Sequence, residues 1–426
     1  MSGSAARRDV IVVGGGPAGM AAAGRAAECG ARVLLLESGP TPGRKLLLTG
    51  NGRCNLSNGA PAPEFLRAYG PARGFLRKAL SVVDRDALED WLGRLGVETV
   101  QEPDGRVFPA DGDARSVLRA LQDHMRQAGV DVLTGQRVGS LLLHGSRLAG
   151  VRTDDGDHAA ECVVVATGGL SYPATGSSGD GYELARQAGH TVVTPYAAVA
   201  ALRTRETWPG KLQGTPAAGV GVRARLADGA MLARADGDLM WTHYGVSGPA
   251  VLRVSPAVTQ ALQGGDEVVL ELDLLPDVMQ NLLQAELRQA AEAHGRRTMA
   301  RVLSDRMPRR AAVVLSEVMG IDPSKQTARW SRQERAHVAR TLKCLPLHVA
   351  GTQPVAEAIV TGGGVDPHEV DPRRMESERV PGLFFAGEVL DAHGPTGGFN
   401  LHAAFATGLV AGEAAASRIH TADGPC

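Results

Sequence analysis

Six residues near the start of the chain, Gly14-Gly15-Gly16-Pro17-Ala18-Gly19, have the types and spacing that hold a pyrophosphate. In such a motif the first glycine permits a tight turn, the second lets the backbone approach the phosphates, and the third allows close helix–strand packing. The amides at the N-terminus of the following helix stabilise the phosphate charge. We therefore expect a dinucleotide here, contacted by Gly14, Gly16, Pro17, Ala18 and Gly19.

An acidic residue completes this pattern. Glu37 follows Gly16 by 21 residues and ends an apolar run that begins at Ala31. A carboxylate at that place can accept hydrogen bonds from both ribose hydroxyls, and it would repel a 2′-phosphate. Glu37 and the adjacent Ser38 are therefore predicted to line the same dinucleotide site.

The elements that position these residues form a β-α-β unit. A β-branched run at 9–13 precedes the glycines, an Ala-rich helical pattern covers 17–29, and Gly30 ends that helix before the apolar run at 31–37. Units of this kind build parallel sheets. The predicted fold class is therefore α/β.

A second set of candidate residues lies near the C-terminus. The apolar run at 382–386 leads into a glycine and an acid, and a glycine turn at 397–398 opens an Ala-rich helix that continues to about Ser417. In flavoproteins an acid after such a strand binds the ribityl chain, and a second helix N-terminus favours the anionic reduced flavin. A solvated loop acid is the alternative for Glu388. The combination favours FAD, with the predicted contacts Gly387, Glu388, Gly397, Gly398, Phe399 and Asn400.

Two further strand ends are expected to reach the same cofactor. The run Cys162–Ala166 ends in Ala166-Thr167-Gly168, a turn at which flavoproteins with two dinucleotide folds approach FAD again. Val138 lies in the strand before it, where such proteins pair their backbone with adenine. We predict all four residues, Ala166, Thr167, Gly168 and Val138, as cofactor contacts.

The loop at 43–58, rich in Gly, Asn and Arg, suits a cradle for the flavin. Arg44 and Lys45 could neutralise pyrophosphate charge. Cys54 could be a redox thiol or a covalent link to the flavin, but no second cysteine lies near it, which favours a small buried residue against the ring. Further predicted contacts are Gly52 and three donors to the flavin carbonyls, Asn51, Arg53 and Asn55.

Four stretches closely resemble signatures of one bacterial flavoprotein family: GRKLLLTGNGRCNLSN at 43–58, THYGVSGP at 242–249, TGGGV at 361–365, and the segment from GEVLD at 387 to Asn400. The family is that of NAD(P)/FAD-dependent or aminoacetone-oxidase-like oxidoreductases, and it includes bile-acid dehydro-reductase-like members. The resemblance spans nearly the whole chain. It implies an FAD domain made from both chain ends, a β-barrel-like insert and a helical insert.

The chain accordingly divides into three predicted parts. Residues 1–190 and 350–426 form a discontinuous, Rossmann-like FAD-binding domain of the two-dinucleotide-binding type. Short alternating stretches such as 219–226 and 267–272 indicate a β-rich insert domain at 191–275. Helical periodicity indicates a helical insert at 276–349.

The β-rich insert carries the candidate catalytic residues, His243 and Tyr244. A proton donor near the flavin N5 would serve reduction of a carbon–carbon or carbon–nitrogen double bond. An ordinary hydrogen-bonded loop histidine is the alternative for His243. Tyr172 is a weaker candidate because the sequence before Pro173 is also typical of a simple turn, and no role is assigned to His393.

Composition narrows the function classes. The chain has 426 residues and a formal net charge of -1, from 45 Lys and Arg against 46 Asp and Glu, so we expect no nucleic-acid partner and no membrane partner. The five cysteines are odd in number and form no C-x-x-C pair, which argues against a disulfide framework or a metal site. No apolar run reaches 18 residues, and we expect a cytoplasmic protein.

These observations predict an FAD-dependent oxidoreductase acting on a small organic substrate. No second G-x-G-x-x-G follows a strand, since the glycines at 362–364 lack the third spaced glycine, so NAD(P)H would dock transiently or the substrate itself would reduce the flavin. One alternative is a flavoprotein acting on tRNA, which balanced charge and the lack of a Lys/Arg-rich face oppose. The other is a non-catalytic FAD-binding protein.

Overall fold

The computed structural model describes residues 8–422, so Cys426 lies outside the described part, and contacts divide the chain into two compact units. Within the described residues, the first unit joins 8–196 and 355–422. The second unit is the continuous segment Ala197–Pro354. Each unit has its own hydrophobic core.

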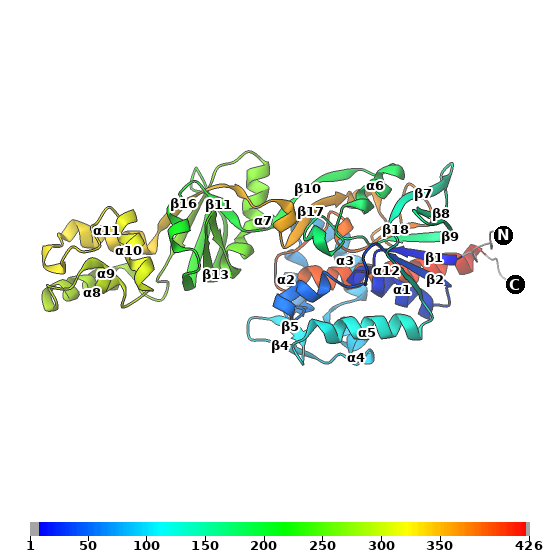
Figure 1. The fold of residues 1–426 in the computed structure, drawn as a ribbon, viewed down its shortest axis with the longest axis horizontal. Coiled ribbons are helices and arrows are strands. Elements are labelled where there is room, and N and C mark those ends of the chain that lie inside the picture. The colour runs from blue at the N-terminus through cyan, green and yellow to red at the C-terminus, as the bar shows by residue number, and fades with distance from the viewer. Residues whose placement is uncertain (1–7, 423–426) are drawn as a thin grey trace. The chain divides into compact units, whose positions relative to one another are not determined.

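The first unit is built on a sheet in the order β6-β2-β1-β9-β8-β7, with β18 pairing with β9 (Figure 1). The strands β6, β2, β1, β9 and β18 are parallel to their neighbours, whereas β7, β8 and the start of β9 form an antiparallel ladder. This arrangement confirms the predicted α/β, Rossmann-like fold class. The strand bounds are β1 (Arg8–Val13), β2 (Val33–Glu37), β6 (Asp131–Thr134), β7 (Val138–His144), β8 (Arg147–Thr153), β9 (Gly156–Val165) and β18 (Leu383–Phe385).

The central strands are continuous apolar runs because both faces of the sheet are covered. Residues Val10, Ile11 and Val12 of β1 are completely buried, and so are Val163 and Val164 of β9. The sequence pattern at 131–138 predicts a single strand, but the structure divides this run into two strands at Gly135. That glycine has φ +68° and turns the chain between β6 and β7.

The remaining elements of the first unit surround this sheet. Its helices are α1 (Pro17–Glu28), α2 (Ala62–Arg67), α3 (Arg73–Val82), α4 (Arg85–Arg94), α5 (Ala114–Gln127), α6 (Asp180–Gln187) and α12 (Phe399–Ala422). A small antiparallel sheet contains β3 (Ser57–Asn58), β5 (Arg106–Pro109) and β4 (Thr99–Gln101), and β10 (Val192–Val199) pairs with β17 (Val360–Val365). No helix within residues 8–422 is both long and apolar enough to cross a membrane.

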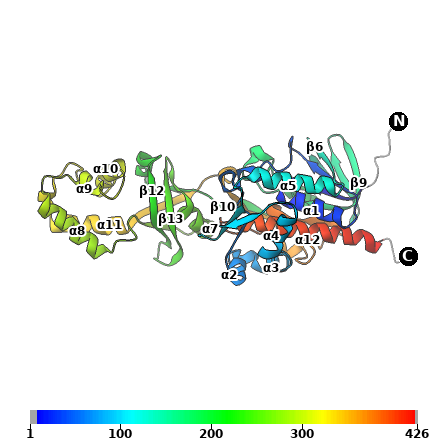
Figure 2. The ribbon, with the colours of Figure 1, turned by 90° about the horizontal axis from the view of Figure 1, so that it is seen from below.

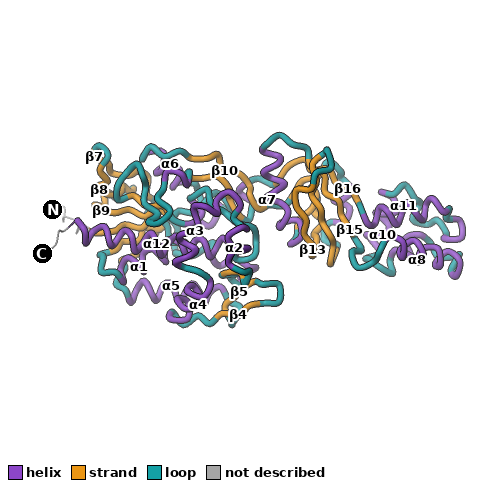
Figure 3. Tube along the Cα trace, turned by 180° about the vertical axis from the view of Figure 1, so that it is seen from behind, coloured by secondary structure: helices purple, strands orange, loops and turns teal. Residues whose placement is uncertain are grey.

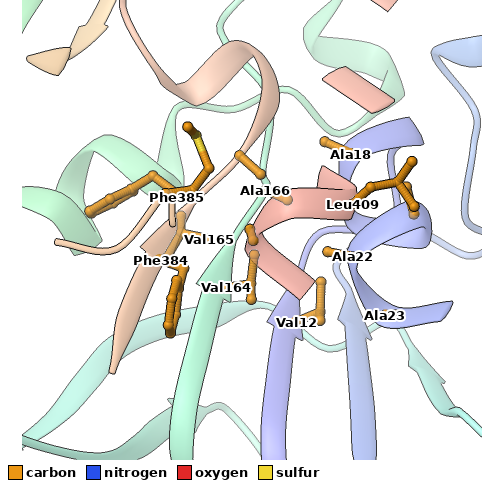
Figure 4. Packing of buried hydrophobic residues seen from close by; sticks show 14 of the residues in the cluster. Val12, Ala18, Ala22, Ala23, Val164, Val165, Ala166, Phe384, Phe385 and Leu409 are labelled. Atoms are coloured by element: carbon orange, nitrogen blue, oxygen red, sulfur yellow. The ribbon is translucent and has the colours of Figure 1, made fainter. Parts of the chain in front are cut away.

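Helices α1 and α12 come from opposite ends of the chain and pack side by side (Figure 2). Small residues make the approach close: a Cβ at Gly408 would overlap the Ala18 carbonyl oxygen, and a Cβ at Gly412 would overlap the Ala22 carbonyl oxygen. Figure 4 shows Ala18 and Ala22 of α1 beside Leu409 of α12, above the strands. The two helices are therefore in backbone contact.

The same contacts show that α1 and α12 run in the same direction, because residue numbers increase together along both helices. An ion pair further along, Arg25 Nη2 to Glu413 Oε2 at 2.8 Å, keeps the same register. Ala18 is the second residue of α1, whereas Gly408 is nine residues beyond the start of α12 at Phe399. At 1.5 Å per residue, the N-terminus of α12 therefore extends about 13 Å past that contact.

The second unit contains a closed barrel in the order β11-β14-β13-β12-β15-β16. Its strands are β11 (Leu202–Thr204), β12 (Pro216–Leu226), β13 (Met231–Thr242), β14 (Gly245–Ser247), β15 (Val268–Asp273) and β16 (Leu345–Thr352). Antiparallel pairing of β11 with β16 closes the ring. The barrel confirms the expected β-barrel-like insert.

The chain leaves the barrel after β15 and returns to it as β16, and the intervening residues 276–344 are helical (Figure 3). The helices there are α8 (Gln280–Ala293), α9 (Met299–Leu303), α10 (Arg309–Val318) and α11 (Arg332–Lys343). One further helix, α7 (Pro249–Gln263), packs on the barrel with Val251, Val254 and Val258 completely buried. Its position within the β-rich region was not indicated by the sequence.

Gly408→Ala is expected to lower the free energy of unfolding by about 2 kcal/mol, because the added methyl group overlaps the Ala18 carbonyl oxygen. Gly93→Ala in α4 is the matched control, since nothing lies within 4 Å of its added atom. It should raise stability by roughly 0.5–1 kcal/mol. Urea unfolding followed by circular dichroism measures both, and unchanged stability of G408A would contradict the close crossing.

Candidate cofactor site

The N-terminus of α1 forms a cradle of backbone atoms. The Gly14 N–H donates to Leu36 O at 2.8 Å, and a Cβ at Gly14 would stand 2.6 Å from Ala166 O. A Cβ at Gly16 would meet no atom within 4 Å, so the space beside this residue is open. Gly16 is the N-cap and carries no side chain to satisfy the first-turn amides. These amides can therefore bind an anion.

Glu37 is buried beside this cradle, with 8% of its surface exposed. Its Oε2 accepts from Gly15 N–H and its Oε1 accepts from Gly39 N–H, both at 2.7 Å. A carboxylate has about four acceptor positions, so two remain for ribose hydroxyls. Ser38 follows at the end of β2.

The loop between β6 and β7 lies next to Glu37. The Gln136 N–H donates to Glu37 O at 2.9 Å, and the Gly135 N–H donates to Gly39 O at 3.0 Å. This loop leads into Val138, the buried first residue of β7. The structure thus brings Val138 to the same side of the site as Glu37.

The end of β9 also faces the cradle. The Ala166 N–H donates to Val13 O at 2.8 Å, and Gly168 has φ +74°. The Thr167 Oγ1 atom between them is buried and has no hydrogen-bond partner within the described part of the chain. An unsatisfied buried hydroxyl is costly, so Thr167 points to a missing partner.

Lys45 and Glu388 form the charged centre of the site. Lys45 Nζ lies 2.6 Å from Glu388 Oε2 and 2.6 Å from Ser171 Oγ. The other carboxylate oxygen of Glu388 accepts from Thr361 N–H at 2.9 Å. Lys45 therefore neutralises a carboxylate of the chain itself. The sequence did not single out Ser171, the partner of Lys45, or Thr361, the partner of Glu388, as site residues.

The loop at 43–58 turns sharply in front of α12. Asn51 and Cys54 have φ +56° and +63°, in the left-handed region. Cys54 is completely buried, and burial raises the pKa of its thiol to about 12. A thiol of this kind stays protonated at neutral pH and is a poor nucleophile. This supports the prediction of a small buried residue over a redox thiol.

The polar side chains of this loop have protein partners. Arg53 Nη2 lies 2.7 Å from Glu102 Oε1, and the Arg53 guanidinium stacks 4.0 Å from the centre of the Phe108 ring. The Asn55 amide, oriented to satisfy its neighbours, accepts from Gly398 N–H at 3.1 Å. Arg44 lies near the cradle, with its Cδ 3.5 Å from the position of a Cβ on Gly39.

The N-terminus of α12 is held from three directions. The Tyr69 hydroxyl donates to Phe399 O at 2.7 Å, and a Cβ at Gly398 would overlap the Ser57 carbonyl oxygen. His402, in the first turns of the helix, places Nδ1 2.8 Å from Ser57 Oγ and Nε2 2.9 Å from Val83 O. Gly387, at the start of the segment 387–400 that leads into α12, is also tied to this helix, because its N–H donates to Thr407 Oγ1 at 3.0 Å.

The segment just before α12 is clamped onto it. Asn400 Nδ2 donates to Gly394 O at 2.9 Å and Pro395 O at 3.0 Å, while its Oδ1 accepts from Gly394 N–H. This positions His393, whose Nε2 lies 3.0 Å from the Tyr196 hydroxyl. The sequence assigned His393 no role and did not single out Tyr196.

Burial sets the ionisation of this Tyr–His pair. It raises the pKa of Tyr196 to about 12, in the same direction as the charge of Asp391. It lowers the pKa of His393, against the opposing charges of Asp391 and Glu388. The phenol is therefore protonated and the imidazole neutral at pH 7. His393 Nδ1 is buried without a hydrogen-bond partner among residues 8–422. A neutral donor pair of this kind can deliver a proton.

His243 and Tyr244 belong to the second unit, at the turn between β13 and β14. Their rings pack edge to face with centroids 4.8 Å apart. His243 is exposed, and Tyr244 is half-buried. The predicted cofactor residues all lie in the first unit.

The residues of the first unit fit FAD. Open space beside Gly16, the unsatisfied Thr167 hydroxyl and the free acceptor positions of Glu37 suit its adenosine diphosphate half. The N-terminus of α12, about 13 Å further along, can meet the other end of an extended dinucleotide. Residues 8–422 contain no group of three or more His, Cys, Asp or Glu side chains suited to a metal ion.

Solved structures with this fold define the class. The 3-ketosteroid-Δ4-(5α)-dehydrogenase of Rhodococcus jostii RHA1 matches with a TM-score of 0.54 and 17% identity over 98% of each chain. The E. coli quinol fumarate reductase FrdA matches with a TM-score of 0.53 and 18% identity over 99% of this chain and 72% of that chain. These matches show the fold, a Rossmann-like domain that the chain shares with these oxidoreductases.

Within that class the chain belongs to the HI0933-like family, whose Rossmann-domain model matches residues 8–414. It is 32% identical to the 3-dehydro-bile acid Δ(4,6)-reductase of Clostridium scindens, over 96% of this chain and 98% of that protein. It is also 32% identical to the ribosomal RNA dihydrouridine synthase of Escherichia coli K12, over 94% of this chain and 96% of that protein. The family resemblance is confirmed.

The His402 anchor predicts how stability depends on pH. Burial lowers the pKa of His402, so below its ordinary value of about 6.5 the unfolded chain binds more protons than the folded one. The neutral His402 therefore contributes its full stabilisation of the fold above that pH. This stabilisation is lost as the pH falls toward the lowered pKa. His402→Gln should therefore flatten the decline in unfolding free energy between pH 7 and 5, measured by urea unfolding.

His368→Gln is the matched control for this experiment, because the His368 side chain is 93% exposed. It should leave the slope of stability against pH unchanged. If H402Q and wild type declined in parallel, His402 would not be the buried neutral anchor of α12.

Proposed function

We propose that this protein uses FAD to reduce a carbon–carbon double bond conjugated to a carbonyl group. The two curated relatives support this class of reaction, since one is named as a Δ(4,6)-reductase of a 3-dehydro-bile acid and the other as a synthase of dihydrouridine. Uridine and an unsaturated 3-oxo steroid share an alkene adjacent to a carbonyl. The relatives thus differ in substrate while the reacting group is the same.

The predicted site residues bind FAD in this proposal. Bound FAD supplies hydride transfer to the β-carbon of the alkene. Glu37 holds the ribose, the α1 N-terminus holds the pyrophosphate, and Glu388 with Lys45 orients the ribityl chain. The other proposed contacts are Gly14, Gly16, Pro17, Ala18, Gly19, Ser38, Arg44, Asn51, Gly52, Arg53, Cys54, Asn55, Val138, Ala166, Thr167, Gly168, Gly387, Gly397, Gly398, Phe399 and Asn400.

The Tyr196–His393 pair carries the proposal, because alkene reduction also needs a proton at the α-carbon. The Tyr196 hydroxyl gives up this proton, and His393 Nε2–H then donates a hydrogen bond to the phenolate oxygen. The phenolate takes its proton back from solvent. His243 and Tyr244 of the second unit are the alternative donors.

Electrons reach the flavin from NAD(P)H that docks transiently, or from a reduced substrate when the reaction runs as an oxidation. A small organic substrate remains the first expectation. A uracil base within RNA is the second candidate, favoured by the charge of one segment described below. If the protein held FAD only as a structural ligand, no alkene would reoxidise its reduced flavin.

Tyr196→Phe should slow reoxidation of the reduced protein by a conjugated enone about 100-fold or more, because the proton donor is lost. Reoxidation by oxygen should be unchanged, since it needs no proton at carbon. After anaerobic reduction with NADPH or NADH, stopped-flow absorbance of the flavin measures both rates. The reduced protein is mixed either with an anaerobic solution of a 3-oxo-4,6-diene steroid or uridine, or with oxygenated buffer.

Tyr172→Phe is the control, because Tyr172 is also a half-buried tyrosine of the first unit. It should leave both rates unchanged. If Tyr196→Phe behaved like this control while His243→Gln or Tyr244→Phe slowed the enone reaction, the proton would come from the second unit instead.

Glu37→Gln should weaken FAD binding by about 10-fold to 100-fold, because charge-assisted hydrogen bonds to the ribose are replaced by neutral ones. Quenching of FAD fluorescence on titration into the apoprotein measures the affinity without turnover. Glu64→Gln, at an exposed site on α2, is the control. Equal affinity of E37Q and wild type would remove Glu37 from the site.

A further inference from the structure

The near-zero net charge of the chain conceals an uneven distribution. The helical segment 276–344 contains 13 Lys or Arg residues and 7 Asp or Glu residues, a net charge of +6. Because the whole chain carries -1, the remainder carries -7. A charge asymmetry of this size within one chain is typical of an electrostatic contact with an anionic partner.

The unpaired positive charge of this segment is entirely arginine. Both lysines of the segment form ion pairs. Lys325 Nζ lies 2.6 Å from Glu334 Oε1, and Lys343 Nζ lies 2.8 Å from Asp273 Oδ2. Six arginines are exposed, and their side chains form neither an ion pair nor a hydrogen bond within the described part of the chain: Arg296, Arg301, Arg309, Arg329, Arg332 and Arg340. Their guanidinium groups are free to bind phosphates with two parallel hydrogen bonds.

Three of these arginines are brought together by the backbone. The segments before α9 and before α11 lie side by side, with Thr327 N–H donating to Arg297 O at 2.8 Å and Ala328 N–H to Gly295 O at 3.1 Å. Arg296 and Arg329 directly follow the contacting pair Gly295 and Ala328.

Arg332 is the third member, in the first turn of α11, whose N-terminus adds positive potential. The nearby carboxylates are already neutralised, since Asp305 pairs with Arg297 at 2.7 Å and Glu334 pairs with Lys325. We call Arg296, Arg329 and Arg332 the arginine cluster.

We propose that the helical segment 276–344 binds RNA through this arginine cluster. The inference rests on the proposed function in one respect: the RNA would carry the uracil ring that is reduced. Arginine suits RNA better than lysine would, because its planar group also stacks on unpaired bases. Similarity to a ribosomal RNA dihydrouridine synthase over 94% of this chain supports RNA over other polyanions.

The test uses the full-length, FAD-loaded, oxidised protein and a fluorescein-labelled, single-stranded oligouridylate of about 20 nucleotides, followed by anisotropy at several salt concentrations. Wild type should bind, and the affinity should fall as salt rises. The triple variant R296A/R329A/R332A should bind about tenfold more weakly at moderate salt. Its log–log salt slope should be smaller by about 2, for three lost phosphate contacts on a single strand.

The matched control is R77A/R94A/R119A, which removes three exposed arginines of the first unit. It should bind RNA like wild type, and both triple variants should retain FAD absorbance and reduction by NAD(P)H. Equal weakening by the two triple variants, or binding to phosphatidylglycerol vesicles without binding to the RNA, would overturn the proposal. Failure of alkene reduction with intact RNA binding would instead overturn only the proposed function.

Discussion

The close parallel packing of α1 against α12 determines where the other parts of the first unit can lie. Ala18 and Ala22 on one helix and Gly408 and Gly412 on the other leave no room for a larger side chain between the two backbones. The register of this contact then places their positively polarised N-termini about 12 Å apart along the helix axes. A molecule with a phosphate group at one end and an electron-accepting ring at the other can be held at both ends by backbone dipoles.

The charged and polar groups of the site are arranged around this pair of helices. Gly387 packs directly on Ala18, with a Cβ at Gly387 standing 2.8 Å from that of Ala18, and it is followed by Glu388. The loop that contains Asn55 closes over Gly398. Glycines at 387 and 398 therefore let two motifs from opposite ends of the chain approach each other closely.

Much of the fold could be predicted from the sequence because its signals are local. The strand, glycine motif, helix and acid at 9–37 lie within one β-α-β unit. The segment 382–400 likewise contains a strand, an acid and a glycine turn that opens a helix. The barrel was harder to predict in detail, since β16 pairs with β11 and β15 across the helical segment. Pairings of this kind depend on tertiary contacts that leave no periodic signal.

The candidate site shows the same division. Residue types in the loop at 43–58 suggested cofactor ligands, but Arg53 stacks on Phe108, and Lys45 pairs with Glu388, 343 residues away. Tyr196 and His393 are 197 residues apart, and only the folded chain brings their polar atoms together. Sequence spacing identifies groups that act within one element, whereas pairs from different elements require the structure.

The origin of α12 at the end of the chain has a consequence for biosynthesis. The contact partners Ala18 and Gly408 are separated by 390 residues, so β1 and β2 cannot complete their core until α12 has also been translated. The continuous segment 197–354 can acquire its own core earlier. During this interval the side of β9 that later receives β18 is an unpaired strand edge, which nascent-chain chaperones would need to shield.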